Sequence, residues 1–320
     1  MVRVVPIHII GAASGFGARD PGCAEGPDTL RNSGVVSKLQ AQGIDLSWRT
    51  ILYPGNAKPI LRIIQEFNEQ LALEVASVAA SRILPLVIGG DHSCAIGTWS
   101  GTFLAIRQHG PLGLIWIDAH MDSHTPRTSP SGAIHGMPLA VLLGQGLPEL
   151  VNIATPKAKL LPRHLCLIGI RSYEEGEAEL LRSLGVRVFF MEEVKRRGIY
   201  SVMSEALEIV CHGTAGFGIS IDLDAFKPKQ SPGVGSPEKG GLHFLKLIQV
   251  IRGIASHPRL LALELAEYNP RHDCQRRTLR LIGDLMAALG QPGEYPQGGG
   301  IQVEPVMNEG LECHLEAMGE

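Results

Sequence analysis

The stretch LIWIDAHMD (residues 114–122) joins a continuous apolar run to three ionisable side chains at two-residue intervals. The apolar run is typical of a strand that is buried on both faces, as in a parallel sheet. Asp118, His120 and Asp122 follow at its carboxyl end. Alternate residues of an extended segment share a side, so these side chains are expected to converge. Two buried carboxylates are costly unless a positive charge lies between them.

The composition is that of a globular protein with a substantial core. The 320 residues are 44% hydrophobic and 19% charged, and the formal net charge is −3. No long block of one charge sign occurs, so neither nucleic acid nor a membrane is expected as a partner. The apolar run before Gly11 is too short to span a bilayer and lacks a cleavage pattern. Six cysteines without C-x-x-C spacing favour reduced thiols in a cytoplasmic protein.

Short apolar runs alternate with longer helical patterns through most of the chain. The expected strands are Val4–Gly11, Leu46–Leu52, Leu84–Ile88, Leu112–Ile117, His164–Ile170, Val186–Phe190, Gly216–Ile221 and Leu260–Leu265. The expected helices are Ala57–Arg82, Cys94–Gln108, Glu174–Leu184, Ile199–His212, Leu242–Ser256 and Gln275–Leu289. This alternation predicts a single α/β domain over residues 1–290, with three layers around a mostly parallel sheet of about eight strands. Residues 291–320, rich in Gly and Pro, are expected to be a loose extension or an arm that contacts a neighbouring subunit.

Polar residues follow four of the expected strands, at the ends where open α/β sheets bind ligands. Besides the opening stretch, these places are LPLVIGGDHS (84–93), GFGISIDLDAF (216–226) and LLALELAEYNP (260–270). His92 follows a Gly-Gly turn, and Asp222 and Asp224 are again two residues apart. Three strand ends thus carry four carboxylates and two imidazoles. Two divalent cations offset four negative charges, so this set predicts a binuclear metal site.

The ligand types favour Mn²⁺ over structural zinc, because carboxylates dominate and thiolates are absent, while Fe, Co, Ni or Zn remain alternatives. Water held between two such ions is acidified to a hydroxide nucleophile, so the expected chemistry is hydrolysis. Each motif also has a structural explanation on its own. Asp222 and Asp224 can follow a strand by chance, and Asp91 or Ser93 can cap the next helix. Three such strand ends together favour the metal site.

The motifs GGDHS (89–93), DAHMD (118–122), SPSGAIHGMP (129–138) and SIDLDAFKPKQSPGVGSPEKGGL (220–242) together resemble the ureohydrolases, the arginase–agmatinase superfamily. So does the early segment GARDPGCAEGPDTLRNSG (17–34). The resemblance runs from about residue 5 to residue 290. The sequence of the third motif is more similar to arginases than to agmatinases. It implies a three-layer α/β/α fold, two Mn²⁺ ions per subunit, hydrolysis of a guanidinium to urea and an amine, and a homo-oligomer, trimer or hexamer.

The resemblance also implies roles for individual residues. The implied metal ligands are His92, Asp118, His120, Asp122, Asp222 and Asp224. Asp122 and Asp222 stand at the bridging positions, and Asp122 accepts the proton of the nucleophile. His135 matches the histidine that transfers a proton to the leaving amine, for which a neutral imidazole is suited. Glu267 matches the carboxylate that holds the guanidinium. Without this frame, His135 would be read as a turn cap and Glu267 as a solvated loop acid.

The far end of the implied substrate pocket departs from the arginase pattern. The expected substrate-binding residues are His124, Ser131, Glu174, Ser236 and Glu267. His124 and Ala133 stand where arginases carry Asn, so two amide donors for an α-carboxylate are missing. Glu174 keeps the charge of the amine-binding Asp but is one methylene longer. Lys227 replaces an Asp beside the metal cleft, where it covers the rim, pairs with an acid or reduces activity.

The sequence therefore predicts a Mn²⁺-dependent ureohydrolase, with L-arginine as the first expectation for its substrate and L-ornithine and urea as products. The alternative substrates are agmatine, guanidinobutyrate, another guanidino acid or formiminoglutamate. The missing amides matter less for agmatine, because it lacks the α-carboxylate. A non-catalytic metal-binding homologue is the third hypothesis, with Lys227 as its sign of degeneration.

Overall fold

A single parallel sheet forms the centre of the protein, as seen in a computed structural model that describes residues 5–56, 58–81 and 83–293. The sheet has eight strands in the order β2-β1-β3-β8-β7-β4-β5-β6. Every neighbouring pair is parallel. The strands are β1 (Ile7–Ala12), β2 (Leu46–Leu52), β3 (Leu84–Gly89), β4 (Leu112–Ile117), β5 (Leu160–Ile170), β6 (Arg187–Phe190), β7 (Gly216–Asp222) and β8 (Leu260–Ala266).

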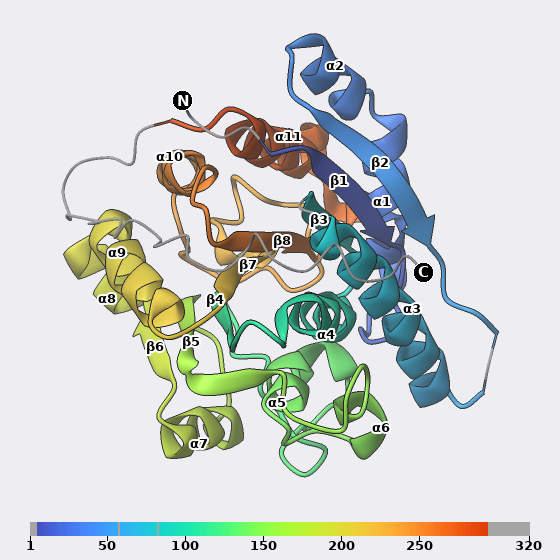
Figure 1. Ribbon diagram of the computed structural model, residues 1–320, viewed down its shortest axis with the longest axis vertical. Helices are drawn as coiled ribbons and strands as arrows, with labels where there is room; N and C mark the ends of the chain where they lie inside the picture. Colours follow the sequence, from blue (N-terminus) through green and yellow to red (C-terminus); the bar gives the residue numbers. More distant parts are fainter. Residues whose placement is uncertain (1–4, 57, 82, 294–320) are drawn as a thin grey trace, which may run out of the picture.

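Helices cover both faces of this sheet (Figure 1). They are α1 (Gly26–Asn32), α2 (Val35–Ala41), α3 (Ile60–Ala80), α4 (Ala95–Ile106), α5 (Pro138–Leu142), α6 (Pro148–Val151), α7 (Glu175–Leu184), α8 (Met191–Arg197), α9 (Ile199–Cys211), α10 (Phe244–Ile254) and α11 (Arg277–Gly290). Helices α3, α4 and α5 lie on one face, whereas α9, α10 and α11 lie on the other (Figure 1). This is the predicted three-layer α/β/α fold. None of the described helices is both long and apolar enough to cross a membrane.

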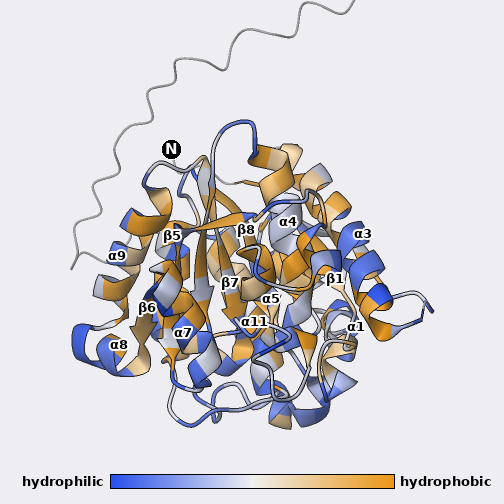
Figure 2. Cartoon of the chain, turned by 90° about the horizontal axis from the view of Figure 1, so that it is seen from below, coloured by the Kyte–Doolittle hydropathy of each residue, from blue (hydrophilic) through white to orange (hydrophobic). Residues whose placement is uncertain are grey.

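Strand β4 shows how the two layers are held. All six of its residues are buried. Ile115 and Ile117 belong to the hydrophobic cluster that includes α8 to α11, whereas Leu114 and Trp116 belong to a second cluster with α4 and α7. Alternate residues thus pack on opposite faces, as the geometry of a strand requires. Figure 2 shows hydrophobic strands enclosed within the protein and hydrophilic residues on the outer helices.

The four central strands bring the polar motifs to one edge of the sheet. These strands lie in the order β3, β8, β7, β4. Strand β7 ends at Asp222, and the other three lead into His92 (β3), Glu267 (β8) and Asp118 (β4). Because all four strands are parallel, their carboxyl ends meet at the same edge. The order of the strands, which the sequence did not give, makes these motifs neighbours.

All eight expected strands are present, with differences at their ends. Strand β5 begins at Leu160, earlier than the expected His164, because the pairing of Leu112 with Leu160 extends it. Strand β1 begins at Ile7, and residues 1–4 lie outside the described residues. Helix α3 begins at Ile60 rather than at residue 57. Residues 57 and 82, the two ends of the expected helix, lie outside the described residues.

Five helices were not expected: α1, α2, α5, α6 and α8. Each has seven residues or fewer, which is too short for a helical period to be visible in the sequence. The expected extension over residues 291–320 stays a prediction, because residues 294–320 lie outside the described part of the chain.

Candidate metal centre

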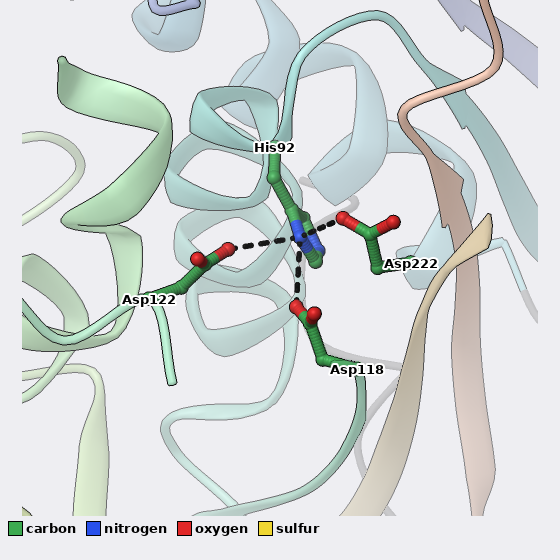
Figure 3. Close-up of side chains that lie close together, drawn as sticks. All are labelled: His92, Asp118, Asp122 and Asp222. Atoms are coloured by element: carbon green, nitrogen blue, oxygen red, sulfur yellow. Dashed lines mark ion pairs between the residues drawn. The ribbon is translucent and has the colours of Figure 1, made fainter. Parts of the chain in front are cut away.

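Three carboxylates point toward one nitrogen of His92 (Figure 3). The distances from His92 Nδ1 to the nearest oxygens are 3.0 Å for Asp222, 3.1 Å for Asp122 and 3.3 Å for Asp118. All four side chains are buried, and this nitrogen has no well-formed hydrogen bond to any described residue. Donors that bind one cation at about 2.0–2.2 Å lie about 3 Å from one another. The spacing, the orphaned nitrogen and the donor types therefore fit a divalent cation.

A second group lies beside the first and shares Asp118 with it. His120 Nδ1 is 3.0 Å from Asp224 Oδ2 and 3.6 Å from Asp118 Oδ1. The other oxygen of Asp118, Oδ2, faces His92. Asp118 is thus the residue common to the two histidine–carboxylate groups, whereas Asp122 belongs only to the first. The expectation that Asp122 and Asp222 bridge the two ions stays a prediction.

The ligands converge through tight turns and not, as expected, through extended backbone. Asp118 Oδ1 accepts a hydrogen bond from His120 N at 2.7 Å, and Asp222 Oδ1 accepts one from Asp224 N at 2.7 Å. Such Asx turns are favoured by Asp because its short side chain reaches the backbone two residues on. The first Asp of each motif thereby holds its own turn with one oxygen and faces His92 with the other.

The carboxylates repel one another in this enclosed space. Burial, together with the charges of Asp224 and Asp118, raises the pKa of Asp222 well above its ordinary value. Burial likewise raises the pKa of Asp224, to about 6. Burial opposes protonation of His92, yet the three surrounding carboxylates outweigh it and raise the pKa of His92. The site therefore demands positive charge, which two divalent cations supply.

His135 and Glu267 meet next to His92. His135 lies in a 3₁₀ turn, η3 (Ile134–Gly136), and its Nδ1 is 3.0 Å from Glu267 Oε1. The same oxygen accepts a hydrogen bond from the backbone N–H of His92 at 2.9 Å. Glu267 is only 6% exposed, so it is not a solvated loop acid. The structure thus places the predicted proton donor and the predicted guanidinium ligand in contact.

The protonation of His135 differs from the expected neutral imidazole. Burial lowers the pKa of His135, but the hydrogen bond and the charge of Glu267 outweigh burial and raise it to about 9. His135 therefore carries its proton at neutral pH, which is the form that a proton donor needs.

Comparison with known proteins agrees with this geometry. The sequence profile of the arginase family matches residues 5–290. The arginase of Bacillus caldovelox is 37% identical over 294 residues, which are 89% of this chain and 97% of that protein. The chain belongs to the arginase family. It is therefore a hydrolase of the ureohydrolase type, with histidine and aspartate groups able to bind metal.

Solved arginases share the fold over nearly their whole length. The Bacillus caldovelox structure has a TM-score of 0.84 at 37% identity and covers 90% of this chain and 99% of that one. The Bacillus subtilis structure has a TM-score of 0.82 at 35% identity, covering 89% and 98%. An Entamoeba histolytica arginase in complex with L-ornithine has a TM-score of 0.82 at 27% identity, covering 90% and 99%.

His124, which departs from the arginase pattern, joins a separate cluster at the start of α7. Its Nε2 is 3.0 Å from Glu174 Oε2 and 3.4 Å from Glu177 Oε2. Its Nδ1 is 3.2 Å from Thr128 Oγ1. Both ring nitrogens thus have hydrogen-bond partners, and His124 lies in neither of the two groups around Asp118. The structure brings together two of the predicted substrate-binding residues, His124 and Glu174.

The remaining predicted residues lie at the surface. Ser131 and Ser236 are exposed, and no hydrogen bond among the described residues joins either serine to the metal groups. Lys227 is also exposed and forms no ion pair with another described residue, which fits a position at the rim. Their part in binding substrate stays a prediction.

Several residues that the sequence did not single out support the ligands. Trp116 Nε1 donates a hydrogen bond to Asp118 Oδ2 at 2.8 Å, and its ring stacks on His92 with 4.1 Å between centroids. Arg171 donates to the backbone carbonyls of Asp224 at 2.7 Å and Glu238 at 3.2 Å, which joins two loops beside the site. Trp116 stands two residues before a ligand, so the two-residue period was the available signal for it.

Proposed function

We propose that this protein hydrolyses L-arginine to L-ornithine and urea, with two Mn²⁺ ions bound per subunit. The observation that carries the proposal is the pair of histidine–carboxylate groups joined by Asp118, with the buried Glu267 and His135 beside them. The arginase from Entamoeba histolytica shares the fold, and its structure was solved in complex with L-ornithine, the product proposed for this chain.

The chain's own residues divide the work. His92, Asp118, Asp122 and Asp222 would hold one ion, and Asp118, His120 and Asp224 would hold the other. When bound, two such metal ions supply a hydroxide nucleophile from water at neutral pH. The donor set, rich in carboxylates and free of thiolates, supports Mn²⁺ as the metal.

Glu267 binds and orients the guanidinium through charge-assisted hydrogen bonds. A bond forms between the oxygen of the hydroxide and the guanidinium carbon, and Asp122 accepts the proton of that hydroxide. The bond from this carbon to the side-chain nitrogen then breaks, and His135 gives its proton to the departing amine. His135 suits this step because the pKa of its imidazole is raised to about 9.

A guanidino substrate without an α-carboxylate is the second candidate. It is supported by the cluster around His124, where an imidazole stands in place of one expected amide donor, with Glu174 at 3.0 Å and Glu177 at 3.4 Å from its Nε2. Agmatine, which ends in an ammonium, suits such an acidic pocket end, since opposite charges attract and an unpaired carboxylate would be repelled.

The deciding experiment measures kcat/KM for arginine, agmatine, guanidinobutyrate and another guanidino acid, with urea as the readout. Formiminoglutamate is tested in parallel with formamide as the readout. Metal content is determined on the same Mn²⁺-loaded sample. The proposal expects two ions per chain and the highest kcat/KM with L-arginine. Turnover of another compound without urea from arginine would refute the substrate. Two bound ions without turnover of any compound would favour the non-catalytic homologue. The homo-oligomeric state and the cytoplasmic location stay predictions, the first of them open to light scattering.

A further inference from the structure

Glu264 is a carboxylate in the middle of the protein that the proposed reaction does not use. It lies in β8 and is 0% exposed. Four donors contact its two oxygens, and all four are neutral groups: Thr98 Oγ1 at 2.6 Å, Ser220 Oγ at 2.7 Å, Trp99 Nε1 at 3.2 Å and Cys94 Sγ at 3.6 Å. These contacts suit an ionised carboxylate, which only accepts hydrogen bonds. Such a costly burial calls for a reason.

A short chain of hydrogen bonds leads from Glu264 to the metal-facing histidine. Ser220 Oγ is 2.7 Å from Glu264 Oε2 and 3.0 Å from His92 Nε2. A serine hydroxyl has a single proton, and a carboxylate can only accept it. Ser220 therefore donates to Glu264 and must accept from the Nε2–H of His92. This arrangement leaves the lone pair of Nδ1 free, on the side where the three aspartates lie.

The same carboxylate also ties together the elements that carry two ligands. Cys94, Thr98 and Trp99 belong to the helical segment that begins at His92. Ser220 belongs to β7, two residues before Asp222, and pairs with Glu264 in the sheet register. Glu264 thus connects the segment that begins at His92 with the strand that ends at Asp222. General experience with metal sites assigns such roles to the partner of the remote histidine nitrogen.

We propose that Glu264 is a positioning residue for the metal centre: acting through Ser220, it holds His92 in the tautomer and orientation that present Nδ1 to the cation. The inference rests on the proposed binuclear site but not on the identity of the substrate. A purely structural role, in which Glu264 only anchors α4 to the sheet, is the alternative that the experiment must separate.

The variants are Glu264→Gln, Ser220→Ala and the double variant, with Thr98→Val as the matched control. A glutamine amide can donate to Ser220, which lets the serine donate to His92 Nε2 and favours the tautomer with a proton on Nδ1. Thr98→Val removes a donor to Oε1 of Glu264 and leaves the link to His92 intact. Binding of Mn²⁺ to the metal-free chains is followed by titration, and their thermal unfolding is measured alongside.

Both single variants should weaken binding of one of the two ions by about 10–100-fold. The double variant should be no weaker than Ser220→Ala, because the two residues act in one chain. Thr98→Val should lower the unfolding temperature while its Mn²⁺ affinity stays within about threefold of wild type. Unchanged affinity in Ser220→Ala, additive effects in the double variant, or equal losses in Thr98→Val would each overturn the proposal. If Glu264→Gln does not fold, Ser220→Ala against Thr98→Val decides alone.

These measurements separate the two proposals. A wild-type chain that binds two ions and releases no urea from arginine would overturn the proposed substrate and leave the role of Glu264 to the titrations. A wild-type chain that binds no divalent cation would overturn both.

Discussion

Replacing Glu267 by glutamine keeps the shape of a buried side chain and removes its charge. In the structure Glu267 is 6% exposed, and its Oε1 accepts from His135 Nδ1 at 3.0 Å and from His92 N at 2.9 Å. A glutamine oxygen can still accept these bonds, so the fold and the metal site should survive. What the variant loses is the charge-assisted hold on the substrate guanidinium.

The size of the loss follows from the burial of this carboxylate. A hydrogen bond to a charged group contributes about 1.5–3 kcal/mol, and removing one charge of a buried pair costs about 2–5 kcal/mol. A loss of about 2–4 kcal/mol at about 1.4 kcal/mol per factor of ten lowers kcat/KM roughly 30- to 700-fold. Arginine and agmatine share the guanidinium, so both should lose the same factor.

The assay is urea release from both substrates at equal metal content, with Glu175→Gln on the exposed start of α7 as the control. The control should stay within about twofold of wild type, because surface substitutions of this kind cost little. If Glu267→Gln changes kcat/KM by less than about threefold, or changes the two substrates by different factors, Glu267 does not hold the guanidinium. Loss of metal in the variant would assign it a structural role in its place.

Three further variants test other parts of the site. His135→Asn should retain metal and lower kcat. In the wild type, kcat/KM should fall as pH rises through about 9, where His135 loses its proton. The pH profile of the variant should lack this fall. His124→Asn offers an amide donor at the pocket end and should raise the arginine-to-agmatine ratio of kcat/KM about tenfold, roughly 1.4 kcal/mol; an unchanged ratio removes His124 from specificity. Trp116→Phe deletes the 2.8 Å hydrogen bond to Asp118; the chain should lose about 1.5–3 kcal/mol of unfolding free energy, measured with denaturant, and a loss below about 0.5 kcal/mol would contradict this account.

Local patterns were enough to predict the layers of the fold and the chemistry of the ligands. Leu112–Ile117 is a strand with the predicted bounds, because a run buried on both faces has a distinct composition. The two-residue spacing of Asp118 and His120, and of Asp222 and Asp224, was visible because each pair directly follows such an apolar run. The sequence did not reveal that Asx turns, rather than extended backbone, bring these side chains together.

Only the tertiary structure decided which residues meet across the sheet. Asp118 is shared by the two histidine groups because each of its oxygens faces a different neighbour. Glu267 meets His92 because β8 lies between β3 and β7, and it contacts His135, 132 positions away, because the turn that holds His135 packs against the turn that begins at His92. Glu264, three residues before Glu267, reaches His92 through Ser220 because of the same strand order. Ligand types and local spacing are written in short stretches of sequence, whereas strand order, and with it the sharing of oxygens and protons, arises only when distant stretches pack.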